Sequence, residues 1–152
     1  PDISHLNDDG VEDVFTLTDA PVVATHSNLR TVCGHPRNLT DAQFQELVRR
    51  GGLCGINFYP LFVTGKKQDS YTYDALRRHL DRMLELGGEQ TVALGSDFDG
   101  APMPSCLNSA EKLVRLYGSV VKWYGESFAD RLFYSNAASF MKHDLTTAEK
   151  GN

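Results

Sequence analysis

Long hydrophobic runs and paired cysteines are both missing from this 152-residue sequence. No apolar stretch approaches the roughly 20 residues that a membrane-spanning helix needs, which argues against a membrane partner. The three cysteines, Cys33, Cys54 and Cys106, are widely spaced and form no C-x-x-C pair, a pattern more typical of a reducing compartment than of a disulfide framework. No signal peptide is recognisable, so we expect a cytoplasmic protein. The abrupt opening at Pro1 suggests that the chain begins inside a larger unit.

Positive charge is scarce as well. Lys and Arg number 15 against 20 Asp and Glu, which gives a net charge of -5. Because no basic cluster offsets that balance, the composition argues against nucleic acid as a partner. The G-x-S-x-G of serine esterases, the G-x-G-x-x-G of dinucleotide-binding proteins and the P-loop are also missing, which excludes these classes as first choices.

What the sequence does contain is an alternation of short apolar segments with amphipathic ones. Four segments predict buried strands, at residues 2–6, 22–25, 53–59 and 91–95. Helices are predicted around residues 11–17, between 40 and 51, and at about 72–86, 108–117 and 128–141. Two helix starts carry a recognisable signal: Asp9 with Glu12 is an acidic start, and Thr40 with Gln43 has the form of a capping box.

Short buried strands that alternate with helices indicate a parallel sheet covered by helices. A complete eight-stranded α/β barrel takes about 250 residues, whereas this chain offers about four strands. We therefore predict an α/β fold that forms half of a TIM-like (β/α)8 barrel over residues 1–145. The polar residues 146–152 are expected to form a loose tail.

His5 and His26 follow the first two predicted strands at the same relative place. In a parallel sheet both would emerge at the carboxyl edge, close together, as imidazoles suited to Zn²⁺. A lone histidine after a strand is more often a hydrogen-bonded structural residue, and that alternative stays open for both. Two imidazoles are too few for a zinc site, which needs three or four protein or water donors.

Asp97 follows the fourth predicted strand, on the same expected edge. Its carboxylate is a candidate ligand, general base or anchor for a substrate amine, and the alternative is a turn or helix-cap residue. Asp99, next to Gly100, fits a turn better and is assigned to structure. Arg37 lies in the polar loop after the second strand, where it is either a solvated charge or a guanidinium fork for a substrate carboxylate.

Other reactive residue types have simpler interpretations. His79 and Asp81 form an H-x-D triplet inside the strongest predicted helix, but residues two apart on a helix point away from each other and cannot chelate one ion. His35 and His143 have no partner pattern and are expected at the surface. Cys54 lies in the middle of a predicted strand and is expected in the core rather than as a nucleophile.

Five ordered motifs of the sequence resemble the membrane (renal) dipeptidase family. They are DISHL at residues 2–6, PVVATHSN at 21–28, HPRNLTD at 35–41, GGLCGINF at 51–58 and GSDFDG at 95–100. The similarity covers nearly the whole chain up to the final helix. The chain looks like the carboxyl-terminal half of a bacterial-type member, without the secretion and lipid-anchor signals of the animal enzymes.

The resemblance implies a binuclear zinc dipeptidase on a (β/α)8 barrel, in which His5 and His26 are ligands of one zinc ion. Arg37 would hold the terminal carboxylate of a dipeptide substrate. Asp97 would face the amino end of the substrate or assist proton transfer. The reaction implied is attack on the dipeptide amide by a hydroxide that bridges two metal ions. Some members of the family also open β-lactams.

The other site residues of the family belong to the first half of the barrel and are not in this chain. They are a His-x-Asp pair on the first strand, a metal-bridging Glu and a further substrate-contacting His. Two hypotheses therefore stay open: a piece of a dipeptidase that is active only with the amino-terminal half, and a non-catalytic half-barrel that serves as a folding or interaction domain. We expect the chain alone to be inactive and to associate with itself or with its missing half, because strands that are interior in a closed barrel become edges.

Overall fold

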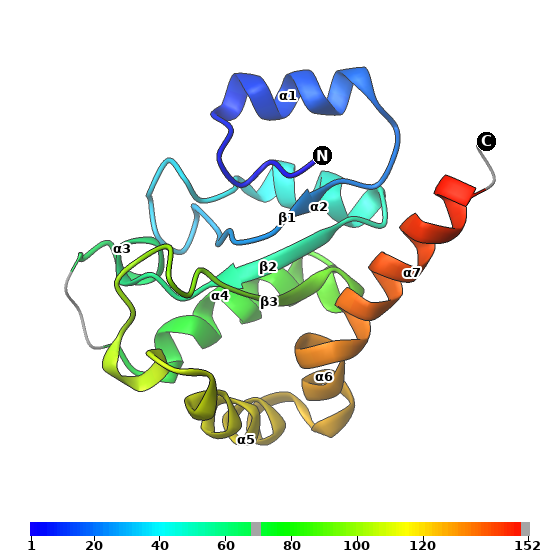
Figure 1. Ribbon diagram of the computed structural model, residues 1–152. Helices are drawn as coiled ribbons and strands as arrows, with labels where there is room; N and C mark the ends of the chain where they lie inside the picture. The colour runs from blue at the N-terminus through cyan, green and yellow to red at the C-terminus, as the bar shows by residue number, and fades with distance from the viewer. Residues whose placement is uncertain (68–70, 150–152) are drawn as a thin grey trace.

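The computed structural model describes residues 1–67 and 71–149, with 143–149 described by their backbone alone. A parallel sheet forms the centre, in the order β1 (Val23–Ala24), β2 (Leu53–Asn57) and β3 (Val92–Ser96). Helices lie around the sheet, with α1 beyond one edge of it and α5 beyond the other (Figure 1). This arrangement confirms the predicted α/β fold of the half-barrel type.

The first predicted strand is reduced to one parallel bridge between Asp2 and Val23. The N–H of Ile3 donates to Val23 O at 2.9 Å, and the N–H of Val23 donates to Pro1 O at 3.1 Å. The Asp2 carboxylate then accepts the N–H of Ser4 at 3.0 Å, and this local bond turns the chain away from further pairing. The opening segment therefore forms an edge of the parallel array beside β1, and it is shorter than the strand expected there.

The described helices cover the following segments: α1 (Asp8–Leu17), α2 (Asp41–Arg49), α3 (Pro60–Thr64), α4 (Tyr73–Glu85), α5 (Leu113–Tyr124), α6 (Glu126–Asp130) and α7 (Asn136–Glu149). Single 3-10 turns lie at Gly88–Gln90, Ser105–Leu107 and Ala110–Lys112, and a π-helical turn, Arg131–Ser135, joins α6 to α7.

The predicted capping box at the start of α2 is confirmed, with the side chains and backbone N–H groups of Thr40 and Gln43 bonded reciprocally. The predicted start of α1 at Asp9 is wrong. Asn7 caps this helix instead, because its Oδ1 accepts the N–H of Gly10 at 2.9 Å. The short helix α3 was not predicted, although it begins with Pro60, a residue whose fixed φ suits the first helical turn.

The helices of the last third are shifted along the chain from their predicted positions. Lys112 Nζ donates to Ser105 O and to Asn108 Oδ1, both at 2.6 Å, and these bonds accompany tight turns where a helix was expected from residue 108. α5 therefore begins at Leu113. The final predicted helix becomes α6, the π-helical turn and α7, so residues 146–149 are helical rather than part of a loose tail. Residues 150–152 lie outside the described part of the chain.

The carbonyl of Thr25 lies against the backbone of β2 and β3. A Cβ atom added at Gly55 or at Gly95 would lie 2.1 Å from Thr25 O, so only glycine fits at either position. The N–H of Ser27 donates to Gly55 O at 2.8 Å in the same region. The two glycines thus bring the loop after β1 close to the neighbouring strands, at the end of the sheet where the candidate site residues lie.

Candidate active site

The candidate site residues gather at the carboxyl edge of the parallel sheet. His26 follows β1 closely, Asp97 follows β3 directly, and His5 lies just after the opening segment beside β1. Arg37 reaches His5 from the loop between β1 and α2, because its Nη1 lies 3.2 Å from His5 Nδ1. The catalytic ends of (β/α)8 barrels have this arrangement.

The imidazoles of His5 and His26 meet through their Nε2 atoms, which lie 3.0 Å apart. The rings cross edge to face, with centroids 5.0 Å apart and an interplanar angle of 61°. Zn–N distances of 2.0–2.1 Å in a tetrahedral site place two imidazole nitrogens about 3.3 Å apart. The observed separation is close to that value, so the pair fits two ligand positions of one ion.

Two imidazoles do not form a metal site on their own. Within the described residues, no group of three or more His, Cys, Asp or Glu side chains is placed to hold an ion. Burial lowers the pKa of His26; the charges of His5 and Arg37 also lower it, whereas Asp97 and Asp2 oppose the change. A lowered pKa keeps this ring in the neutral form that binds metal ions.

Asp2 and Thr25 lie behind His26. Thr25 Oγ1 is 2.8 Å from His26 Nδ1 and donates to Asp2 Oδ2 at 2.6 Å. Burial would raise the pKa of Asp2, but hydrogen bonds from Thr25 and Ser4 outweigh it and lower this pKa to about 2. An ionised carboxylate therefore stands one hydroxyl away from the imidazole. Sequence patterns gave no reason to single out either residue.

Arg37 contacts both His5 and the aromatic ring of Phe62. Besides the bond to His5, its guanidinium lies 5.5 Å from the centre of the Phe62 ring, within cation–π distance. Its Nε is buried and has no hydrogen-bond partner among the described residues. His35, expected at the surface, is instead half-buried. Its Nδ1 accepts the N–H of Arg37 at 3.1 Å, and its ring packs against that of Phe62 at a tilt of 46°, with the centroids 4.6 Å apart.

Asp97 is held by the backbone and by a buried amide. It adopts a left-handed conformation with φ of 71°, and its neighbours Ser96 and Asp99 also have positive φ. Such strained positions cluster at functional sites. Asn57, fully buried at the end of β2, donates from Nδ2 to Asp97 Oδ2 at 3.1 Å. Asn28 in turn bonds the backbone of Asn57 through both its side-chain atoms.

Asn57 and Asn28 were missed as supports of the site, although each is a polar residue beside an apolar strand. Residues set aside from the sequence are structural here. His79 is fully buried in α4 and Cys54 is fully buried in β2. Cys33, Cys54 and Cys106 are all free thiols. The side chain of His143 lies outside the described residues.

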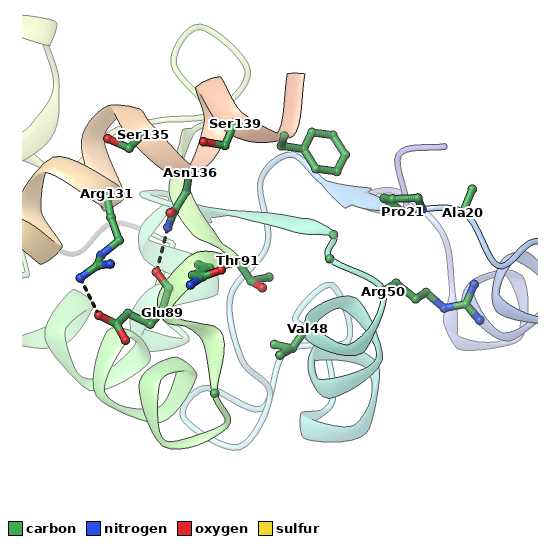
Figure 2. A pocket seen from close by; sticks show the side chains of 15 residues that line it. Ala20, Pro21, Val48, Arg50, Glu89, Thr91, Arg131, Ser135, Asn136 and Ser139 are labelled. Carbon is green, nitrogen blue, oxygen red and sulfur yellow. Dashed lines mark hydrogen bonds and ion pairs between the residues drawn. The ribbon is translucent and has the colours of Figure 1, made fainter. Parts of the chain in front are cut away.

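A hollow of about 890 Å³ lies at the opposite, amino-terminal end of the strands, lined by residues that include Pro21, Gly52 and Thr91 (Figure 2). Two of its polar side chains bond within the hollow: Arg131 pairs with Glu89 at 2.9 Å, and Asn136 donates to the carbonyls of Glu89 and Val92. We therefore place the chemistry at the imidazole edge and not in this hollow.

Imidazoles, a guanidinium and a carboxylate gather here at the carboxyl edge of a parallel α/β sheet, which is the edge where (β/α)8 enzymes carry their active sites. The family model for membrane dipeptidase (peptidase family M19) matches residues 1–150, and the chain belongs to this family. The predicted family is thereby confirmed. Among the described helices, none has the length and apolar character that crossing a membrane would require.

This chain spans about half the length of several known proteins to which it is similar. A protein of the pqqA 5′ region of Klebsiella pneumoniae is 35% identical over 145 residues, which are 93% of this chain and 54% of that protein. The crystal structure of dipeptidase AC, a metallopeptidase of family M19, is 36% identical with a TM-score of 0.89, over 93% of this chain and 43% of that one. A metallopeptidase from Rhodobacter sphaeroides, liganded with a phosphinate mimic of the dipeptide L-Ala-D-Ala, gives the same identity and TM-score, over 93% and 41%.

Proposed function

We propose that this chain is part of a zinc-dependent dipeptidase and supplies half of its active site. The observation that carries the proposal is the pair of Nε2 atoms of His5 and His26, 3.0 Å apart at the carboxyl edge of the sheet. Membership of the M19 family supports metal-dependent hydrolysis of peptides. The chain spans about half the length of its relatives, so the complete activity is assigned to a full-length protein that contains it.

His5 and His26 would hold one metal ion through Nε2, and the remaining ligands would come from the other half of the barrel. Bound zinc lowers the pKa of water and polarises the carbonyl of the scissile amide. Arg37 would bind the terminal carboxylate of the dipeptide, since a guanidinium forms paired, charge-assisted bonds to a carboxylate.

Asp97 would bind the amino group of the substrate or hold a proton during cleavage. One of its oxygens accepts a hydrogen bond from the Asn57 amide, which fixes the direction of the carboxylate. Its charge also acts on His26, where it opposes the lowering of the pKa of that ring by burial. The Asp97 carboxylate is therefore near enough to influence His26 electrostatically, although its hydrogen bond is to Asn57 of β2.

We further propose that the 152-residue chain alone is inactive and pairs with the missing half of the barrel or with another copy of itself. Two imidazoles leave at least half of the coordination of a zinc ion to water. Among the described residues, the segment beside β1 and the strand β3 are the outermost members of the parallel array, which is where a complete barrel would continue with further strands. A half-barrel without catalytic function is the alternative outcome of the test below.

The test compares the 152-residue chain with the protein encoded by the whole reading frame that contains it. Both are assayed for hydrolysis of an Ala-Ala dipeptide with added Zn²⁺, and their masses are measured by light scattering. Activity from the full-length protein and none from the chain supports the proposal. A full-length protein that binds no zinc and cleaves no dipeptide would favour the non-catalytic alternative, and rapid hydrolysis by a monomer of the chain would refute the half-site assignment.

A further inference from the structure

We propose that Asp2 and Thr25 are positioning residues for His26. Together they hold its imidazole in the tautomer that carries the proton on Nδ1, which leaves the lone pair of Nε2 directed at the metal position. The inference rests on the proposed function only in taking His26 as a metal ligand. Its basis is the count of donors and acceptors along one hydrogen-bond chain.

The hydrogen-bond chain ends at the carboxylate of Asp2, which only accepts hydrogen bonds. Its Oδ1 accepts the N–H and the hydroxyl of Ser4 and the N–H of Thr25, at 3.0, 2.8 and 3.2 Å. Its Oδ2 lies 2.6 Å from Thr25 Oγ1. Two oxygens at that distance need a proton between them, and the Thr25 hydroxyl is the group that can supply it, because a carboxylate with four donors around it is ionised.

The hydroxyl of Thr25 has one hydrogen, and Asp2 receives it. The contact between Thr25 Oγ1 and His26 Nδ1, at 2.8 Å, must therefore take its hydrogen from the ring. His26 is thus a donor at Nδ1 and, in its neutral form, an acceptor at Nε2.

The other end of the hydrogen-bond chain, at Arg37 and His5, gives the same tautomer of His26. A guanidinium has donors only, so Arg37 Nη1 donates to His5 Nδ1 across 3.2 Å. Neutral His5 then carries its proton on Nε2, which faces His26 Nε2 at 3.0 Å. That nitrogen of His26 must accept, as the Thr25 side already requires. Binding of a metal ion through His5 Nε2 would require the proton of His5 to move to Nδ1, so Arg37 would then give up its bond to that nitrogen.

This arrangement is the support that a metal-binding histidine needs. Such a ring normally donates its second N–H to a carboxylate, carbonyl or water, and loss of that partner typically weakens metal binding 10–100-fold. Here the Thr25 hydroxyl lies between the two groups: it donates to the Asp2 carboxylate and accepts from the His26 ring. Ser4 adds a second restraint, because its Oγ accepts the backbone N–H of His26 at 3.1 Å.

The first experiment needs no substitution. Ring-nitrogen NMR of the metal-free 152-residue chain, at about pH 8 where imidazoles are neutral, should show His26 with a protonated Nδ1 and an unprotonated Nε2. A ring protonated on Nε2, or an equal mixture of tautomers, would overturn the proposal. This readout does not depend on zinc binding, so it separates failure of the inference from failure of the proposed function.

The second experiment measures Zn²⁺ affinity of the full-length protein by competition with a chromophoric chelator. Thr25→Val keeps the shape and removes the hydroxyl, and should weaken binding about 10–100-fold. Thr25→Ser should restore affinity, because it returns the hydroxyl. Thr16→Val is the matched control, since this exposed hydroxyl bonds only within α1 and its loss should change nothing. Unaltered affinity in Thr25→Val, or equal losses in Thr25→Val and Thr25→Ser, would contradict this role of the hydroxyl.

Discussion

Acidification of the chain should act on His79, whose side chain in α4 is completely buried. Its Nδ1 accepts the N–H of Leu29 at 3.2 Å, so its Nε2 carries the proton and donates to Val63 O at 3.1 Å. Burial lowers the pKa of this ring to about 4, with a further contribution from Arg78 and against the effect of the Val63 bond. Protonation of Nδ1 would break this bond, because the N–H of the ring and the N–H of Leu29 would then face each other as two donors.

The sign follows from where the proton binds. In the unfolded chain the ring has its ordinary pKa of about 6.5, so the unfolded state takes up the proton first as the pH falls. The stability that neutral His79 contributes is complete above about pH 6.5 and is lost down to the folded pKa of about 4. Over that pH interval the free energy of unfolding should fall by about 3 kcal/mol in total, and about 2 kcal/mol of this is lost by pH 5.

Urea denaturation of the chain between about pH 8 and pH 5 measures this loss. His79→Gln should lower the free energy of unfolding at pH 8, because at least one buried backbone bond is disturbed, and should flatten the dependence on pH. His35→Gln is the control: it removes a half-buried imidazole and should keep most of the acid-induced loss. If His79→Gln lost as much stability as the wild type over this range, the reasoning would be refuted.

Three further predictions concern the site and the sheet that carries it. In the full-length protein, Arg37→Ala should raise KM for dipeptides at least tenfold and spare substrates whose carboxyl group is amidated; equal kinetics on both would remove Arg37 from the site. Asp97→Asn should lower kcat by about 10²-fold or more with zinc content unchanged by metal analysis, and loss of zinc would make Asp97 a ligand instead. Gly55→Ala should destabilise the chain by about 1–3 kcal/mol or more in urea denaturation, because its Cβ would lie 2.1 Å from Thr25 O; a neutral effect would contradict the close approach.

Local signals in the sequence predicted the elements that local physics decides. The capping box at Thr40 and the apolar stripe of α4 lie where they were expected, because both depend on residues within one or two turns. The opening strand was overestimated, since the bond from Ser4 to Asp2 ends its pairing after one bridge. The start of α5 was missed because Lys112 reaches back to a carbonyl seven residues earlier.

In the candidate site, too, the sequence predicted what depends on local pattern and missed what depends on contacts between distant residues. The positions of His5, His26 and Asp97 after the first, second and fourth predicted strands pointed to one edge of the sheet, and the structure places them there. Their supports were not predictable in this way. The Thr25–Asp2 bond joins residues 23 positions apart, and the Asn57–Asp97 bond joins residues 40 apart. Such partners are set by strand order and register, which become known only when the chain is folded.

The most direct test of the account is the position of the metal. A crystal of the full-length protein grown with Zn²⁺, with diffraction data collected at the zinc absorption edge, should show an anomalous peak about 2.0–2.1 Å from Nε2 of both His5 and His26. An anomalous peak bound by neither imidazole, with the two Nε2 atoms still hydrogen-bonded to each other, would contradict the central claim that this pair is half of a metallopeptidase site.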